Sequence, residues 1–223
     1  MKISILCLFC IIPLYVFPQD SKTIDYGSFS VAIGSNQGSI SVDYFHSWKL
    51  GRFKNIEVGI GGRLTSYFGT SKYYSSAPSS LAADEKKSDS LLLQSPQVNA
   101  LNLAINLGYR ISPKFGAGFN IDALGFSFGG RQSALYINGN QSQSTSAKPT
   151  SFNVLLVGNN DQGSLNSEFY LRYFFKEKLA IKLAYQHLFT EYTSDSEVQQ
   201  LPEANNRFRN KANLVSLGIT KQF

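Results

Sequence analysis

The last stretch of the chain, Lys211 to Phe223, constrains the fold more than any other. Val215, Leu217 and Ile219 occupy alternate positions in it, and mostly small or polar side chains lie between them. A period of two indicates a β-strand with one apolar and one polar face, because successive side chains of a strand point to opposite sides. We therefore predict a strand that ends on the aromatic residue Phe223.

The same alternation recurs along the chain, most clearly from Leu101 to Ile111, where every odd-numbered residue is apolar. In the segment that starts at Phe115 the apolar phase slips near Leu124 and Gly125, and a glycine at such a slip suggests a β-bulge. The fold class predicted by this pattern is all-β, with antiparallel strands. The pattern gives eight strands, at residues 28–35, 40–48, 56–68, 101–111, 115–128, 169–173, 179–189 and 211–223.

The connections after strands two, four and six are short, whereas three of the four on the other side are long, the exception being a hairpin turn at Asn36–Gly38. Within the second long connection, Ala134–Ile137 and Phe152–Val157 are apolar but too short to span a membrane, which takes roughly 9 to 11 residues, so we expect them to form one hairpin beyond it. Short turns on one side and long loops on the other are typical of a transmembrane β-barrel with an even number of strands. The short connections are residues 49–55, 112–114 and 175–178, and the long, extracellular ones are 70–96, 130–164 and 193–210.

The N-terminal segment has the features of a secretory signal peptide. Lys2 precedes an apolar run from Ile3 to Phe17, which is too short, and too interrupted by Pro13, for a membrane-spanning helix. We therefore predict a signal peptide at residues 1–18 and a barrel domain at 26–223. Both cysteines of the chain lie in this segment, so no disulfide or cysteine metal site is expected in the barrel.

Composition agrees with a membrane barrel. The mean hydropathy is only −0.14, as expected when every second strand residue faces lipid. The chain has 17 Phe and 12 Tyr, residues that concentrate at the two membrane interfaces. The net charge of +6 comes from scattered residues without a nucleic-acid motif, so we expect no nucleic-acid partner. Asn159 to Gly163 lacks the spacing and closing glutamate of a calcium loop, so we expect a turn and no metal or other cofactor.

With the apolar phase taken as outward, the inward phase carries balanced charges. Buried charges need partners, and the interior of an eight-stranded barrel is just wide enough for side chains to fill it. We therefore expect a packed polar interior in which Glu57 and Lys182 face each other across the barrel, and in which Leu124 and Leu214 are the inward aliphatic residues. The predicted inward charges are Asp43, Glu57, Asp122 and Glu168 with Arg63, Arg110, Arg172 and Lys182.

A closing strand with a terminal aromatic residue resembles the last strand of Gram-negative outer-membrane β-barrels. The whole pattern is similar to the small OmpA/OmpX type, over roughly residues 26–223. The resemblance implies an outer-membrane location, a monomer among outer-membrane lipid and lipopolysaccharide, and a role for Phe223 in the signal that the β-barrel assembly machinery recognises. It also implies a structural or surface-interaction function through the long loops, without enzymatic activity.

Two other functions stay open at this point. Ser167 and His187 can lie opposite each other on the outward face, which resembles lipid A deacylases of the outer membrane, so a lipid A-modifying hydrolase is one alternative. His46 and Ser47 are adjacent and point to opposite faces, and Glu191 is roughly 13 Å of strand rise from His187, too far to orient it simply. The other alternative is a narrow channel or a transporter of hydrophobic ligands.

Overall fold

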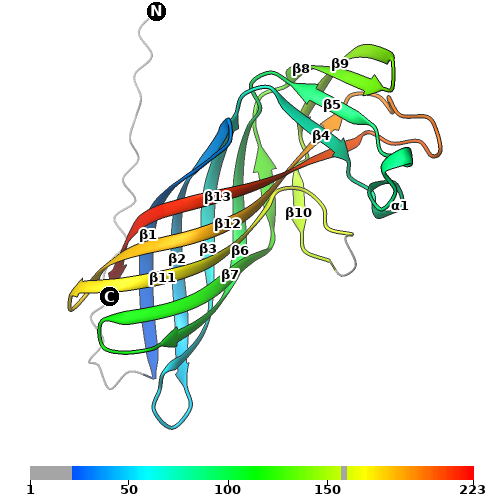
Figure 1. Ribbon diagram of the computed structural model, residues 1–223. Helices are drawn as coiled ribbons and strands as arrows, with labels where there is room; N and C mark the ends of the chain where they lie inside the picture. Colours follow the sequence, from blue (N-terminus) through cyan, green and yellow to red (C-terminus); the bar gives the residue numbers. More distant parts are fainter. Residues whose placement is uncertain (1–21, 157–159) are drawn as a thin grey trace, which may run out of the picture.

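The structure is a computed structural model that describes residues 22–156 and 160–223, so the predicted signal peptide lies outside the described residues. The described residues are all-β and antiparallel, as predicted, with 13 strands in one sheet (Figure 1). None of the described residues forms a helix long and apolar enough to cross a membrane. The strands are β1 (Thr23–Gly34), β2 (Gln37–Leu50), β3 (Ile56–Gly69), β4 (Lys72–Ser76), β5 (Ser90–Leu93), β6 (Gln97–Arg110), β7 (Phe115–Phe128), β8 (Gln132–Asn138), β9 (Gln141–Pro149), β10 (Phe152–Val154), β11 (Leu165–Lys176), β12 (Leu179–Ser194) and β13 (Arg207–Gln222), and the short helices are α1 (Ser79–Ala82) and η1 (Glu85–Lys87).

The long strands pair in a closed ring, which we call the main ring. Each long strand pairs with the next long strand of the chain, and β13 pairs back onto β1. The register joins Leu183 of β12 to Leu217 of β13, and Val31 of β1 to the same Leu217. The closing strand is thereby paired along both edges. The main ring consists of β1, β2, β3, β6, β7, β11, β12 and β13.

The polarity of the main ring is opposite to that of a water-soluble protein. On β13 the apolar residues Val215, Leu217 and Ile219 are 58%, 62% and 59% exposed, whereas the intervening Ser216 and Thr220 are fully buried. The other long strands show the same arrangement, with apolar side chains outside and polar ones inside. The alternation in the sequence is therefore an alternation between an apolar outer surface and a polar interior.

The phase slip in β7 is a bulge at Ala123. The β6–β7 register skips this residue, because Leu103 pairs with Leu124 and Ala104 pairs with Asp122. The extra residue turns Leu124 outward, where it is 43% exposed. The prediction that Leu124 points inward was therefore wrong, since the strand changes phase one residue before it. Leu214 is buried, on the inward phase.

A second, smaller ring stands above the main ring, and we call it the cap ring. The far ends of β12 and β13 continue beyond the other long strands and pair with β9 and β4, respectively. β9 pairs with β8, β8 pairs with β5, and β5 pairs with β4. Six strands therefore form a closed ring in the order β12, β9, β8, β5, β4 and β13. Figure 1 shows β4, β5, β8 and β9 together at one end of the molecule.

The cap ring corrects three expectations about the long connections. Residues 70–96 are not an irregular loop, because they contain β4, α1, η1 and β5. Ala134–Ile137 pairs with residues 142–145 of β9 and not with the Phe152 segment. Phe152–Val154 instead forms β10, which pairs with the upper part of β7. The expected single hairpin is thus divided between two partners, and the sheet has five strands more than the eight expected.

The cap ring has an apolar core. Tyr74, Leu91, Leu93, Tyr136 and Phe208 are buried there in one cluster. Burial of these side chains is the main stabilising contribution available to strands as short as four residues. The Tyr136 hydroxyl donates a hydrogen bond to the carboxylate of Asp89, and burial, together with this contact, raises the pKa of Tyr136 to about 12.

Candidate functional site

The interior of the main ring is the candidate functional site, because it holds the charged residues of the inward phase. Seven of the eight predicted inward charges are buried, and Arg110, at the end with the short turns, has a side chain that is 20% exposed. All of them lie on long strands that alternate an outward apolar residue with an inward polar one. The residues form two clusters at different levels.

The central cluster joins five strands. Arg63 Nε lies 3.0 Å from Asp122 Oδ1, and Lys182 Nζ lies 3.0 Å from Glu168 Oε1 and 3.2 Å from Asp43 Oδ2. These charges are carried by β2, β3, β7, β11 and β12. Ion pairs that link distant walls in this way hold the ring together from within.

Asn120 connects the two ion-pair groups of the central cluster. Its side-chain carbonyl accepts a hydrogen bond from Arg63 Nη2 at 2.6 Å, and its amide donates to Glu168 Oε1 at 3.2 Å. Gln186 donates to the other oxygen of Glu168 at 2.9 Å. The cluster is therefore continuous from Asp122 to Lys182, with neutral amides between the charged groups.

The second cluster lies at the end with the short turns. Tyr26 donates a 2.8 Å hydrogen bond to Glu57 and accepts one of the same length from Arg110. The guanidinium of Arg172 stacks 4.2 Å from the centroids of the Tyr26 and Tyr170 rings. Aromatic rings thus stabilise a buried arginine through cation–π contacts.

The expected pairing of Glu57 with Lys182 is wrong. Lys182 pairs with Asp43 and Glu168, and Glu57 pairs with Arg110 at 3.8 Å. The strands of a closed ring are tilted and staggered, so equal distances from the short turns along the chain do not give equal heights across the interior.

Small inward residues accompany the long charged side chains in the interior. Ser30, Ser41, Ser216 and Gly218 line the inward faces of β1, β2 and β13. A Cβ added to Gly218 would lie 2.3 Å from Ser30 Oγ, so this position has no room for a side chain. A cavity of about 10 Å³ lies beside Tyr26, Glu57 and Arg172, about the space of one water molecule.

A buried amide network was missed by the sequence analysis. The Asn102 amide donates to Asp122 Oδ2 at 2.7 Å, and its carbonyl accepts from Asn153 at 2.7 Å. Asn153 in turn accepts hydrogen bonds from Ser127 and from the backbone N–H of Ser164. The sequence carries a signal for Asn102, because it lies on the same inward phase as the charges.

Ser167 and His187 lie directly opposite each other in the β11–β12 register. His187 Nδ1 is 2.6 Å from Asn213 Oδ1, while Ser167 Oγ donates to the backbone carbonyl of His187 at 3.3 Å. The serine hydroxyl is therefore not bonded to the imidazole, which is the contact that activates a nucleophile. Within the described residues, no group of three or more His, Cys, Asp or Glu could hold a metal ion.

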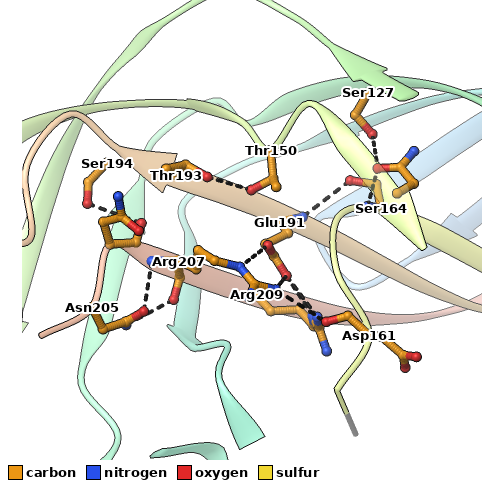
Figure 2. Close-up of polar contacts among 12 residues, drawn as sticks. Ser127, Thr150, Asp161, Ser164, Glu191, Thr193, Ser194, Asn205, Arg207 and Arg209 are labelled. Atoms are coloured by element: carbon orange, nitrogen blue, oxygen red, sulfur yellow. Dashed lines mark hydrogen bonds and ion pairs between the residues drawn. The ribbon is translucent and has the colours of Figure 1, made fainter. Parts of the chain in front are cut away.

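Glu191 belongs to a different arrangement on the outer face, shown in Figure 2. Its fully buried carboxylate accepts hydrogen bonds from Arg207 Nε and Arg209 Nη2, each at 2.8 Å. Both arginines also donate to the backbone carbonyl of Asp161. This clamp holds the described residues just before β11 against β12 and β13. Arg207 and Arg209 both lie on the outward phase of β13, within the residues 193–210 that the sequence predicts to be a loop.

Phe223 lies at the seam where the main ring closes. Its backbone N–H donates to the carbonyl of Asp25 on β1 at 3.0 Å. Its ring is tilted against Tyr44, with 6.4 Å between centroids, and Lys221 Nζ lies 5.0 Å from its centre. The last residue therefore contacts β1 and β2 as well as its own strand.

Comparisons with solved structures found β-barrels. The chain aligns with the N-terminal β-barrel domain of Pseudomonas aeruginosa OprF (TM-score 0.36, 9% identity, 91% of this chain and 98% of that chain). It also aligns with Neisserial surface protein A (0.38, 9%, 90% and 96%) and with the Yersinia pestis outer membrane protein Ail in a phospholipid nanodisc (0.41, 10%, 90% and 99%). These structural neighbours are outer-membrane β-barrels.

The comparisons of sequence gave no assignment. No family model matches the chain, and no curated protein matches it.

Proposed function

We propose that this chain is an eight-stranded transmembrane β-barrel of an outer membrane, with a side-chain-filled interior and a folded cap at the cell surface. The observation that carries the proposal is the polarity of the main ring. A ring surrounded by water would be destabilised by this arrangement, in which Val215, Leu217 and Ile219 are exposed outside while Arg63 and Lys182 are buried inside. In lipid the same arrangement is favourable, because the outer face meets hydrocarbon and the closed ring leaves no long strand with an unpaired edge.

The length of the strands supports the same proposal. A strand of 14 residues such as β6, tilted by about 40°, covers roughly 35 Å along the ring axis. The apolar band of an outer-membrane barrel is roughly 25 Å tall. Exposed aromatic residues flank this band at the end with the short turns (Trp48, Phe115, Phe175) and at the cap end (Phe68, Phe126, Phe128).

The proposed role is structural, or interactive through the cap, and does not include transport. The clusters around Asp122 and Glu57 occupy the main ring, and the apolar core around Tyr74 and Phe208 closes the cap ring. A solute would have to cross both. The channel alternative is therefore less well supported than a closed barrel, and the hydrolase alternative lacks a bond between Ser167 and His187.

The single tryptophan of the chain offers a direct test. Trp48 lies on the outward face of β2 and is 41% exposed. In vesicles of phosphatidylcholine brominated along the acyl chains, its fluorescence should be quenched strongly, whereas a soluble quencher such as acrylamide should have little effect. The reverse result, in protein whose heat-modifiable migration on gels shows that it is folded, would rule out a lipid-facing main ring.

A further inference from the structure

The ionisable side chains are distributed very unevenly along the axis of the molecule. In the described residues the interior carries four bases and four acids, and the cap end, including the clamp on the outer face, carries eight of each. The turn end, meaning the end with the short connections, carries eight bases and only two acids, Asp25 and Glu177. The bases of the turn end are Lys22, Lys49, Arg52, Lys54, Lys114, Lys176, Lys178 and Lys221.

The entire formal excess of the described residues, six positive charges, therefore lies at one end of the ring. Scattered positions in the sequence converge there because the β2–β3, β6–β7 and β11–β12 connections all return to the same side. The net charge of the whole chain does not indicate this convergence, because it carries no information on where the strands bring the charges together.

The turn-end cations are free to meet an external anion. None of the eight forms an ion pair with any described residue, although Arg110 and Arg207 elsewhere do. All but Lys49 are exposed. Of the two acids, Asp25 is already engaged, since its Oδ1 lies 2.7 Å from His46 Nδ1.

The cations surround the ring and do not form a patch on one side of it. The β2–β3 connection brings Arg52 and Lys54, the β6–β7 connection brings Lys114, and the β11–β12 connection brings Lys178. Lys221 lies at the β1–β13 seam. A protein docking on one face would use only part of this distribution, whereas a surrounding layer of lipid headgroups meets all of it.

Aromatic residues place the cations at headgroup level. Trp48, Phe53, Phe115 and Phe175 are exposed next to these turns, and such residues mark the boundary between hydrocarbon and headgroups in membrane barrels. Lysines adjoining them can extend along the boundary to reach phosphate groups. Their ammonium groups then lie within a Debye length of the lipid phosphates, where attraction is strong.

We propose that the turn end is a binding surface for anionic phospholipid headgroups, with phosphatidylglycerol as the representative chemistry, in the leaflet that the short turns face. The inference rests on the proposed function, because the ring must span a membrane. The lysines select lipids of net negative charge over zwitterionic ones. They thereby hold the barrel at a fixed depth and surround its turn end with anionic lipid.

Trp48 also reports on this surface, because it lies beside the turn-end cations. The full folded chain would be reconstituted in symmetric vesicles that contain phosphatidylcholine and phosphatidylglycerol, with bromine on one lipid or the other. The ratio of quenching gives the relative affinity of the two lipids for the surface around Trp48. At low salt we expect phosphatidylglycerol to be preferred roughly fivefold, the factor for about one lysine per headgroup, and the preference to fall at high salt.

Two matched variants identify the residues responsible. Replacing Lys22, Lys49, Arg52 and Lys54 with Gln removes the four turn-end charges next to β1, β2 and β3, the strands around Trp48, and should bring the preference close to one. Replacing Lys86, Lys87, Lys148 and Lys211 with Gln removes the same charge from the cap end and should leave the preference unchanged. Equal affinity of the native protein for both lipids would overturn the proposal, and so would an equal loss in both variants.

The outcome can be separated from a failure of the proposed function. If the main ring does not face lipid, neither brominated lipid will quench Trp48. If the ring faces lipid but the turn end is not selective, both lipids will quench it equally. Symmetric vesicles offer the same lipids to both ends, so the result does not depend on the direction of insertion.

Discussion

Arg63 Nε and Asp122 Oδ1 lie 3.0 Å apart inside the main ring, and neither side chain is more than 1% exposed. The two residues come from β3 and β7, which are separated by β6 in the ring. Their contact therefore reaches past a neighbouring strand, and backbone pairing alone would not provide it. Charge pairing within the interior thus adds connections that the sheet lacks.

Asp122→Ala should destabilise the barrel strongly. It leaves Arg63 buried beside a neutral residue, which typically costs about 3 to 5 kcal/mol. Urea unfolding in lipid vesicles, followed by heat-modifiable migration, measures the change. Asp195→Ala is the matched control, because it breaks the exposed pair with Arg131 and should cost about 1 kcal/mol or less. Similar losses for the two variants would contradict a role of the interior in stability.

The cap should resist proteases until its core is damaged. Leu91 is fully buried in the cap core, and Leu→Ala at such a site typically costs about 2 to 5 kcal/mol. We expect Leu91→Ala to make residues 70–96 sensitive to protease added to intact cells while the main ring stays folded. Leu201→Ala, at a side chain that is 78% exposed, should leave the protease pattern as it is. Cleavage of the native cap at the same rate as the Leu91 variant would show that the cap is not a folded unit.

The proposed topology places the cap outside the cell and the turn end in the periplasm. A single cysteine at Ser144, in the cap, should react with a membrane-impermeant maleimide on intact cells. A cysteine at Lys114, in a short turn, should react only after the outer membrane is opened. If only the cysteine at position 114 were labelled on intact cells, the topology would be the reverse of the one proposed.

Phe223→Ala should lower the yield of folded protein in the outer membrane. The ring of Phe223 contacts the seam between β13 and the first two strands, and the resemblance of the closing strand implies a second role, in assembly. Export to the periplasm should be unaffected, which separates assembly from secretion. Leu107→Ala, at an outward side chain of β6 that is 52% exposed and away from the seam, is the control. If Phe223→Ala left the yield and the heat-modifiable migration unchanged, Phe223 would have neither role.

Overproduction of the native protein should leave lipid A acylation unchanged. Ser167 donates to a backbone carbonyl, and the His187 imidazole is bonded to Asn213, so the serine has no base. Mass spectrometry of lipid A measures this directly. Loss of an acyl chain that Ser167→Ala prevents would establish the hydrolase alternative instead.

The sequence was sufficient to predict the long strands wherever the outer face is apolar. The predicted strand 101–111 overlaps most of β6, and the bulge was expected within two residues of Ala123. Beyond the apolar band the outward residues become polar. At Glu191, Arg207 and Arg209 the contrast between the two faces disappears, and the ends of β12 and β13 were consequently interpreted as loop.

The cap could not be predicted from the sequence because its strands are short and pair with segments that are distant in the chain. β4 and β5 have only five and four residues, too few for a period to be recognised, and β4 pairs with β13, more than 100 residues away in the chain. In the interior, alternation indicates which residues face inward. It does not indicate that Lys182 pairs with Asp43, because that depends on the stagger of tilted strands.

The sharing of β12 and β13 by both rings has a consequence for the order of assembly. β9 needs the end of β12 as a partner, and β4 needs the end of β13. The cap ring therefore cannot close before the strand that also closes the main ring has docked. An antibody that recognises only the closed cap would consequently report completed barrels, and partly assembled chains would not present that surface.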